Sequence, residues 1–186
     1  MLTLQEVISS LYGAWRLARF DARGMAFFDT TLGGFWRSFF AAVLVAPAYV
    51  LVVSTGGGAV HGDTVRFGLA ETIGYILSWV AFPVVMEWLT RQLGCRARYL
   101  SYITAYNWAS VIEHLLLLPV LVITARNLLP DAAGQLLWLV TLVFIVVYAW
   151  FVTRTALAVT TLTAAAIVFL DIGLSYVITL MTVAVE

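Results

Sequence analysis

The sequence contains no lysine: its ten basic residues are all arginine, and ten acidic residues balance them. A net charge of zero gives no reason to expect a nucleic acid or another polyanion as a partner. There is one cysteine, Cys95, which excludes an internal disulfide and supplies none of the paired spacing of a metal site. The sequence therefore predicts neither a metal nor a cofactor.

Charge of either sign is also scarce. Charged residues make up 11% of the 186 residues and hydrophobic residues 63%, whereas soluble domains carry about 25% charged residues. The first stretch of the chain lacks the basic start, compact apolar run and small-residue cleavage site of a secretory signal, so we expect the amino terminus to be retained. This composition predicts a membrane protein whose main partner is the lipid bilayer.

Long apolar runs define the predicted fold. A helix needs about 20 apolar residues to cross about 30 Å of hydrocarbon, and barrel strands would be shorter and alternating. Five runs meet the requirement: Phe35–Ser54, Phe67–Trp88, Tyr99–Ala125, Gly134–Val152 and Ala156–Val185. We therefore predict an all-α fold, with a five-helix transmembrane domain at 35–186 after an amphipathic segment at 1–34. Only Thr153, Arg154 and Thr155 separate the last two runs, which predicts a tight helical hairpin at these residues.

The arginines predict the orientation, because short loops rich in arginine stay in the cytoplasm. Two arginines, Arg66 and Arg126, fall on one side of the predicted bundle. The other eight fall on the opposite side: Arg16, Arg19, Arg23, Arg37, Arg91, Arg96, Arg98 and Arg154. Using only arginine is typical of a GC-rich bacterial genome. We expect a multi-pass protein of the bacterial cytoplasmic (inner) membrane with a cytoplasmic amino terminus and a periplasmic carboxyl terminus.

An amphipathic helix is predicted before the first span. Its apolar residues recur at helical spacing, and they are Leu4, Ile8, Leu11, Trp15 and Ala18. Thr3 and Glu6 have the spacing of a capping box, in which the hydroxyl and the carboxylate satisfy free amide groups at the helix start. Two placements are open: the helix lies in the cytoplasmic interface of the membrane, or it packs beneath the bundle.

The candidate functional residues are polar groups in the membrane interior. Such groups are costly in hydrocarbon and usually face other helices or water. The central cluster consists of Asn107, Ser110, Glu113, His114 and Asp171, and Glu71, Tyr75, Tyr106 and Ser175 are secondary candidates. Because adjacent helical residues point about 100° apart, Glu113 and His114 should meet different partners. We expect His114 to bond Asp171, and Glu113 to meet Asn107 or a water molecule.

Other functional patterns are weak. No HExxH, GxSxG or paired cysteine pattern predicts an enzyme. The glycine-rich segment Ser54–Asp63 lacks the Lys-Ser/Thr of a phosphate-binding loop. His61 and Asp63 lie in that segment, and two ligands alone are a poor basis for a metal site. Catalytic and metal-binding residues are therefore not predicted.

The segment GCRARYLSYITAYNWASVIEHLLLLP, at Gly94–Pro119, follows a basic turn and ends in a proline. With five spans and a cytoplasmic amino terminus, it resembles the bacterial branch of the Yip (Ypt-interacting-protein-like) membrane family. The resemblance covers roughly 35 to 185, but the Glu113-His114 pair and the Ala105-Tyr-Asn-Trp spelling depart from the family pattern. It implies a membrane-organising or trafficking-type role of the kind assigned in eukaryotes, an essentially unassigned role in bacteria, and no catalytic residues.

Two functions are weighed, of which the sequence favours the first and leaves the second as the alternative. The first is a non-enzymatic inner-membrane protein of scaffold or accessory type with a buried polar core. The second is a small proton-coupled transporter or channel component that uses Glu113, His114 and Asp171. Both are compatible with a homo-oligomer or a larger membrane complex.

Overall fold

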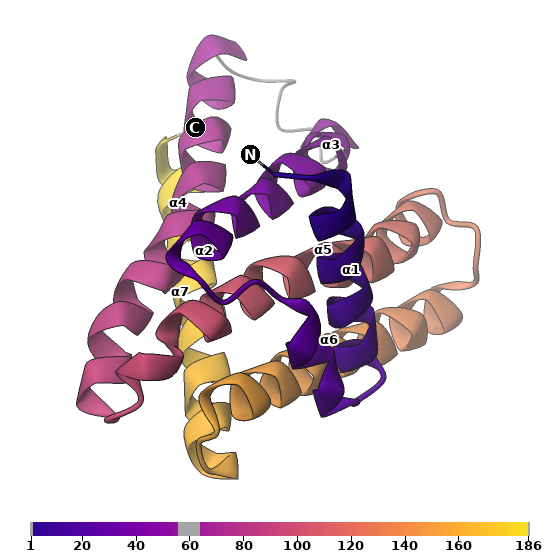
Figure 1. Cartoon of the computed structure of the whole chain (residues 1–186). Helices are drawn as coiled ribbons and strands as arrows, with labels where there is room; N and C mark the ends of the chain where they lie inside the picture. The colour runs from indigo at the N-terminus through magenta and orange to yellow at the C-terminus, as the bar shows by residue number, and fades with distance from the viewer. Residues whose placement is uncertain (1, 56–63, 186) are drawn as a thin grey trace.

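The chain folds as a bundle of helices (Figure 1). A computed structural model describes residues 2–55 and 64–185, and within these ranges it contains seven α helices, two short 3₁₀ helices and no strand. The α helices are α1 (Leu4–Ala18), α2 (Leu32–Ser38), α3 (Phe40–Thr55), α4 (Thr64–Gln92), α5 (Tyr99–Ala125), α6 (Asp131–Leu157) and α7 (Thr161–Val185). The 3₁₀ helices are η1 (Ala22–Phe27) and η3 (Arg96–Arg98). The all-α prediction is confirmed.

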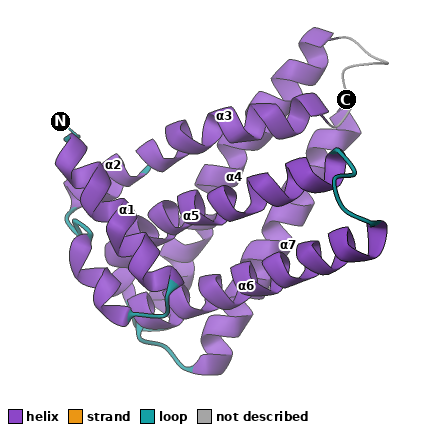
Figure 2. Cartoon of the chain, turned by 90° about the vertical axis from the view of Figure 1, so that its right-hand side faces the viewer, coloured by secondary structure: helices purple, strands orange, loops and turns teal. Residues whose placement is uncertain are grey.

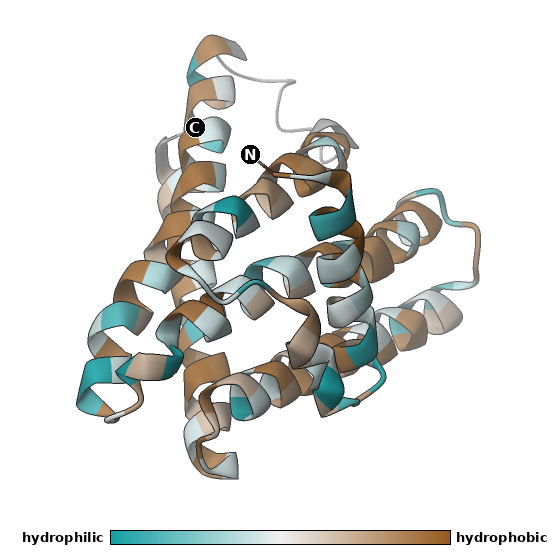
Figure 3. Ribbon diagram, viewed as in Figure 1, coloured by the Kyte–Doolittle hydropathy of each residue, from teal (hydrophilic) through white to brown (hydrophobic). Residues whose placement is uncertain are grey.

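Within residues 2–55 and 64–185, five helical segments are long and apolar enough to cross a membrane. They are Leu32–Val53, Val65–Gln92, Arg96–Ala125, Asp131–Leu157 and Thr161–Ala184. Each overlaps one predicted span, so the number of spans is confirmed. The first segment combines α2 and α3, which are separated by a turn at Phe39. Figure 3 shows hydrophobic residues along most of these helices, with hydrophilic residues gathered at the turns.

The predicted hairpin turn at Thr153, Arg154 and Thr155 is wrong. α6 continues through these residues and ends at Leu157, after which Ala158 adopts a left-handed conformation with φ 51°. The Thr153 hydroxyl bonds the Ala149 carbonyl one turn earlier at 2.8 Å, so this polar side chain is satisfied inside the helix. The Thr160 hydroxyl instead accepts from the Thr163 amide at 3.2 Å and caps the start of α7.

The helices lie in two groups (Figure 2). α3, α5 and α6 run nearly parallel, with α5 in contact with both neighbours, whereas α4 and α7 pack on each other and cross behind this layer. Phe82 of α4 and Tyr106 of α5 are in ring contact, with centroids 4.7 Å apart. The crossing of the two groups therefore brings side chains of α4, α5 and α7 together in the bundle interior.

α1 packs on the bundle, against α5 and α6. Its buried face consists of Ser10, Gly13, Ala14, Leu17 and Ala18. The Tyr148 hydroxyl of α6 donates to the Ala14 carbonyl at 2.9 Å. A Cβ on Gly24 of η1 would come within 2.5 Å of the Gly13 carbonyl oxygen, so glycine permits the close approach of η1 to α1. The amino-terminal segment thus shares a core with the spans.

The opposite side of α1 is apolar and exposed. Leu4 is 75% exposed, Ile8 58% and Trp15 50%, and Tyr12 lies on the same side. Most of the predicted apolar stripe therefore faces away from the bundle, because small residues on the other face allow closer helix packing. α1 both packs on the bundle and presents an apolar surface, which combines features of the two predicted placements.

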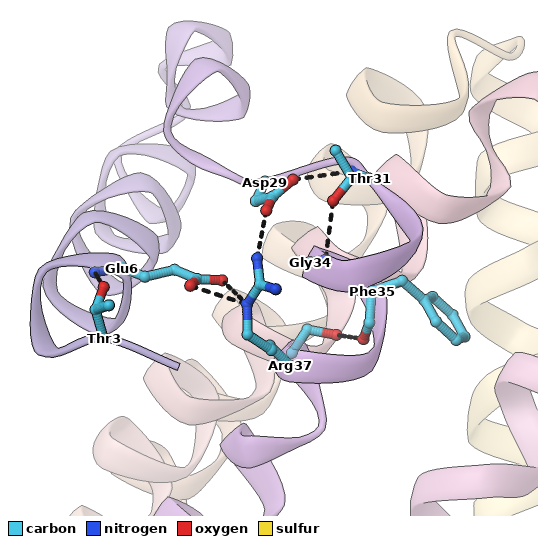
Figure 4. A network of polar contacts seen from close by, with 8 residues as sticks. Thr3, Glu6, Asp29, Thr31, Gly34, Phe35 and Arg37 are labelled. Carbon is cyan, nitrogen blue, oxygen red and sulfur yellow. Dashed lines mark hydrogen bonds and ion pairs between the residues drawn. The ribbon is translucent and has the colours of Figure 1, made fainter. Parts of the chain in front are cut away.

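An ionic cluster fixes α1 to the start of the first span (Figure 4). The Arg37 Nε of α2 donates to the two Glu6 carboxylate oxygens at 2.7 and 2.9 Å, and its Nη2 donates to Asp29 at 2.5 Å. The Thr3 hydroxyl accepts from the Glu6 amide at 3.2 Å, which confirms the hydroxyl half of the predicted capping box. The carboxylate half of the predicted capping box is wrong, because the Glu6 carboxylate is bonded to Arg37.

Candidate functional site in the bundle interior

A tyrosine and an aspartate connect α5 and α7 where the two helix groups cross. The Tyr106 hydroxyl lies 3.0 and 3.1 Å from the two carboxylate oxygens of Asp171, to which it donates. The ring of Tyr106 rests against Phe82 of α4, which limits its rotation. Tyr106, a secondary candidate from the sequence, is therefore the direct hydrogen-bond partner of Asp171.

Glu113 lies beside this pair. It follows Tyr106 by seven residues, about two helical turns, so both side chains point from the same face of α5. The Glu113 carboxyl group lies within electrostatic reach of Asp171. It makes no hydrogen bond or ion pair with the residues that the structure describes. Glu113 and Asp171 thus form a carboxyl pair at electrostatic range, in which Asp171 alone has a hydrogen-bond donor.

His114 points elsewhere, and the predicted bond between His114 and Asp171 is wrong. The His114 Nδ1 lies 2.7 Å from the Ser110 carbonyl oxygen; because a carbonyl only accepts, Nδ1 carries the hydrogen. The ring lines a cavity of about 210 Å³ between α3 and α5, whose walls include Tyr49 and Leu117. One residue along a helix turns the side chain by about 100°, which takes His114 away from α7.

Asn107 faces α2, so the predicted contact between Glu113 and Asn107 is wrong. The Asn107 Nδ2 donates to the Ser38 hydroxyl at 2.8 Å, and Ser38 donates to the Phe35 carbonyl at 2.7 Å. The Asn107 Oδ1 is buried and has no partner among the described residues. Ser110 bonds the Tyr106 carbonyl within its own helix at 3.1 Å. The predicted central cluster is therefore divided into two polar groups on different faces of α5.

A second cavity brings together the other secondary candidates. It has a volume of about 300 Å³ and lies between α3, α4 and α7. Its polar lining includes Glu71, Tyr75, Ser78, Ser175 and Thr179. Ser175 lies one helical turn from Asp171 along α7. The cavity therefore extends along α7 to within one turn of the carboxyl pair.

Tyrosines hold the α4 wall of this cavity. The Tyr49 hydroxyl of α3 donates to Glu71, and the Tyr75 hydroxyl donates to the Ala42 carbonyl at 2.5 Å. The rings of Tyr49 and Tyr75 are 4.6 Å apart. Tyr49 was not among the predicted site residues, because a single tyrosine in an apolar run gives no sequence signal.

Tyr102 is a further polar residue that the sequence pattern did not single out. It is fully buried, and its hydroxyl is 3.1 Å from the Thr153 hydroxyl of α6. Tyr102 precedes Tyr106 by one turn on α5 and lies within reach of its ring. Tyrosine hydroxyls therefore join α5 to α6 as well as to α7.

The described residues contain no group of three or more histidine, cysteine or acidic residues that could hold a metal ion. His61 and Asp63 lie outside the described residues. The site as described offers carboxyl and hydroxyl groups, whose chemistry is proton transfer and hydrogen bonding.

The five spans and this polar interior define a multi-pass α-helical membrane protein. No family model matches the chain, and no curated protein or solved structure matches it.

Proposed function

We propose that the protein exchanges protons at the Glu113–Asp171 pair, as a small proton-coupled transporter or a component of a channel. One observation carries the proposal: the Glu113 side chain lies within electrostatic reach of Asp171 and has no hydrogen bond or ion pair with any described residue. A carboxyl group with only a structural role would be expected to have a donor, as Asp171 has in Tyr106.

The cost of charge in a membrane supports a shared proton. Each ionised carboxylate near the centre of a membrane helix costs about 2.5–3.5 kcal/mol on insertion scales. Two ionised groups would cost about 5–7 kcal/mol before their mutual repulsion, which is comparable with the whole stability of many domains. One bound proton removes both a charge and the repulsion, since two close carboxyl groups disfavour double ionisation.

The cavity between α3, α4 and α7 supports an access route to the pair. Glu71 is a carboxyl group on its wall, and the hydroxyl groups of Ser78, Ser175 and Thr179 follow along the same surface. Water in a cavity of about 300 Å³ could carry protons toward Asp171. With the cytoplasmic amino terminus that the arginines predict, this cavity belongs to the periplasmic half of an inner-membrane protein.

The proton-binding step is tested by infrared difference spectroscopy of the purified protein as pH is varied. We expect a carbonyl band of a protonated carboxyl group that titrates and is altered in both Glu113→Gln and Asp171→Asn. Glu87→Gln is the matched control, because Glu87 is paired with Arg91 at an exposed helix end. If no band titrates, or if Glu113→Gln leaves it unchanged, the proposal is refuted.

Transport is tested in liposomes that contain a trapped pH dye. A pH gradient should decay faster with the protein than in empty liposomes, and Glu113→Gln should remove most of this difference while Glu87→Gln retains it. If the carboxyl pair titrates but the liposomes show no flux, the proton-binding step stands and the transport role is refuted.

A scaffold or accessory role without enzymatic activity is the second candidate. Asn107 and Ser38 are completely buried and bond to each other between α5 and α2, a use of polar groups that fixes helix packing. The proposed Yip resemblance would also fit this role. In that case Glu113→Gln should change stability or assembly in a complex, and no pH-dependent flux should be found.

A further inference from the structure

A basic cavity lies at the end of α1, far from the carboxyl pair in the chain. Its volume is about 400 Å³. The residues that line it are Tyr12, Trp15, Arg16, Arg19, Asp21 and Arg23. Three guanidinium groups and one carboxylate give the cavity a net charge of +2, which favours an anionic ligand.

The single carboxylate is fully engaged by two of the arginines. Asp21 accepts from the Arg16 Nε at 2.8 Å and from the Arg23 Nε at 3.0 Å. These guanidinium groups hold the pKa of Asp21 well below its usual value, so that it remains an anion near neutral pH. Asp21 therefore acts as the fixed counter-ion that positions Arg16 and Arg23.

Arg19 has no such counter-ion. It is exposed at the C-cap of α1, and its side chain makes no hydrogen bond or ion pair with the described residues. A guanidinium group is a planar fork of donors that matches the oxygens of a phosphate group. Arg19 is thus available for a ligand, whereas its neighbours are already oriented by Asp21.

The cavity continues into the exposed apolar side of α1. Trp15 and Tyr12 belong to both, and Ile8 and Leu4 follow at successive turns. Exposed apolar helix faces flanked by arginine and tryptophan are typical of helices that lie in a membrane interface. A basic cavity at the end of such a face suits a ligand that has an anionic head and an apolar tail.

We propose that this cavity binds the phosphate group of an anionic phospholipid, with an acyl chain along Trp15, Ile8 and Leu4. The ligand is a lipid rather than free phosphate because the arginines are continuous with the apolar surface. The site goes beyond the proton chemistry proposed above and does not depend on it.

Native mass spectrometry of the detergent-solubilised full chain tests the proposal, with phosphatidylglycerol and phosphatidylcholine added separately. We expect the wild type to retain phosphatidylglycerol preferentially. Arg19→Glu should lower its retention on the order of tenfold or more, since each basic residue near an anionic membrane contributes substantially to binding. Because Arg19 has no partner among the described residues, this variant should still fold, which its melting temperature will check.

Arg66→Glu is the matched control, because it makes the same charge change on α4 and Arg66 does not line the cavity. It should retain phosphatidylglycerol as the wild type does. Equal retention of the two lipids, or an equal loss in both variants, overturns the proposal. Displacement of the lipid by the same concentration of inorganic phosphate or glycerol phosphate would show a free-phosphate site and overturn the lipid assignment.

Discussion

The Tyr106 hydroxyl of α5 lies at nearly equal distances, 3.0 and 3.1 Å, from the two carboxylate oxygens of Asp171 in α7. Few other contacts join these two helices, since α7 packs mainly on α4 and α6. The bond therefore connects the α4–α7 pair to the layer formed by α3, α5 and α6. It also sets the position of Asp171 relative to Glu113.

Tyr106→Phe should destabilise the protein by about 1–3 kcal/mol, because it leaves a partly buried Asp171 without its donor. The melting temperature in mild detergent measures the effect. Asp171→Asn in the Tyr106→Phe background should cost less than it does in the wild type, since the two residues share one interaction. Strictly additive effects would show that the bond contributes nothing.

Arg37→Gln should release α1 from the first span, because Arg37 bonds both Glu6 of α1 and Asp29 of the preceding loop. We expect faster hydrogen exchange in residues 4–18, with little change in α5 and α6. The control is Arg91→Gln, which breaks a pair within one helix turn and holds no second element in place. Equal exchange of α1 in the wild type and Arg37→Gln would contradict the role of this cluster.

Acidification should loosen the same amino-terminal segment. Bonds from the Thr31 backbone amide and hydroxyl, together with the charge of Arg37, lower the pKa of Asp29, and the pKa of Asp21 is lowered by Arg23 and Arg16. A carboxylate whose folded pKa is lowered stabilises the fold fully above its unfolded pKa, about 3.9 for aspartate, and this stability is lost as pH falls toward the folded value.

Limited proteolysis between pH 6 and pH 3 measures this change, with an acid-active protease. Cleavage near α1 and η1 should increase as pH falls below about 4. Asp29→Asn should be cleaved more readily than the wild type at pH 6 and should show a smaller increase. A cleavage rate independent of pH over this range would contradict the prediction.

Gly24→Ala should destabilise the packing of η1 on α1 by about 1–3 kcal/mol, because the added Cβ would lie 2.5 Å from the Gly13 backbone oxygen, which cannot move aside freely. Gly68→Ala in α4 is the control, since a Cβ there meets nothing within 4 Å. It should be neutral or should stabilise the helix by up to about 1 kcal/mol. Equal melting temperatures of the two variants would contradict the close approach of Gly24 and Gly13.

The spans could be predicted from the sequence because membrane thickness sets the length of an apolar helix. The same information does not determine rotation of a helix about its axis. His114 was expected to face α7 and Asn107 to face Glu113. Instead, His114 faces α3 and Asn107 faces α2. Polar residues at three- and four-residue spacing lie within one broad sector of a helix surface. Which neighbouring helix each residue faces depends on how α5 packs against α2 and α3 on one side and α7 on the other.

The hairpin between α6 and α7 shows a second limit. The sequence has a polar break at Thr153, Arg154 and Thr155, but α6 continues through it. The Thr153 hydroxyl bonds the Ala149 carbonyl, and the Arg154 guanidinium lies over the Trp150 ring. Thr160, which caps α7, could have been recognised from its spacing to Thr163. The carboxyl pair has no local signal, because Glu113 and Asp171 are separated by α6.

The bond between Tyr148 and the Ala14 carbonyl has a consequence for biosynthesis. α1 leaves the ribosome well before its partner on α6, which emerges more than a hundred residues later. Until α6 has been made, the exposed leucine, isoleucine and tryptophan of α1 can hold this helix at the lipid surface. A helix made before α6 thus reaches its final position only after α6 has been made.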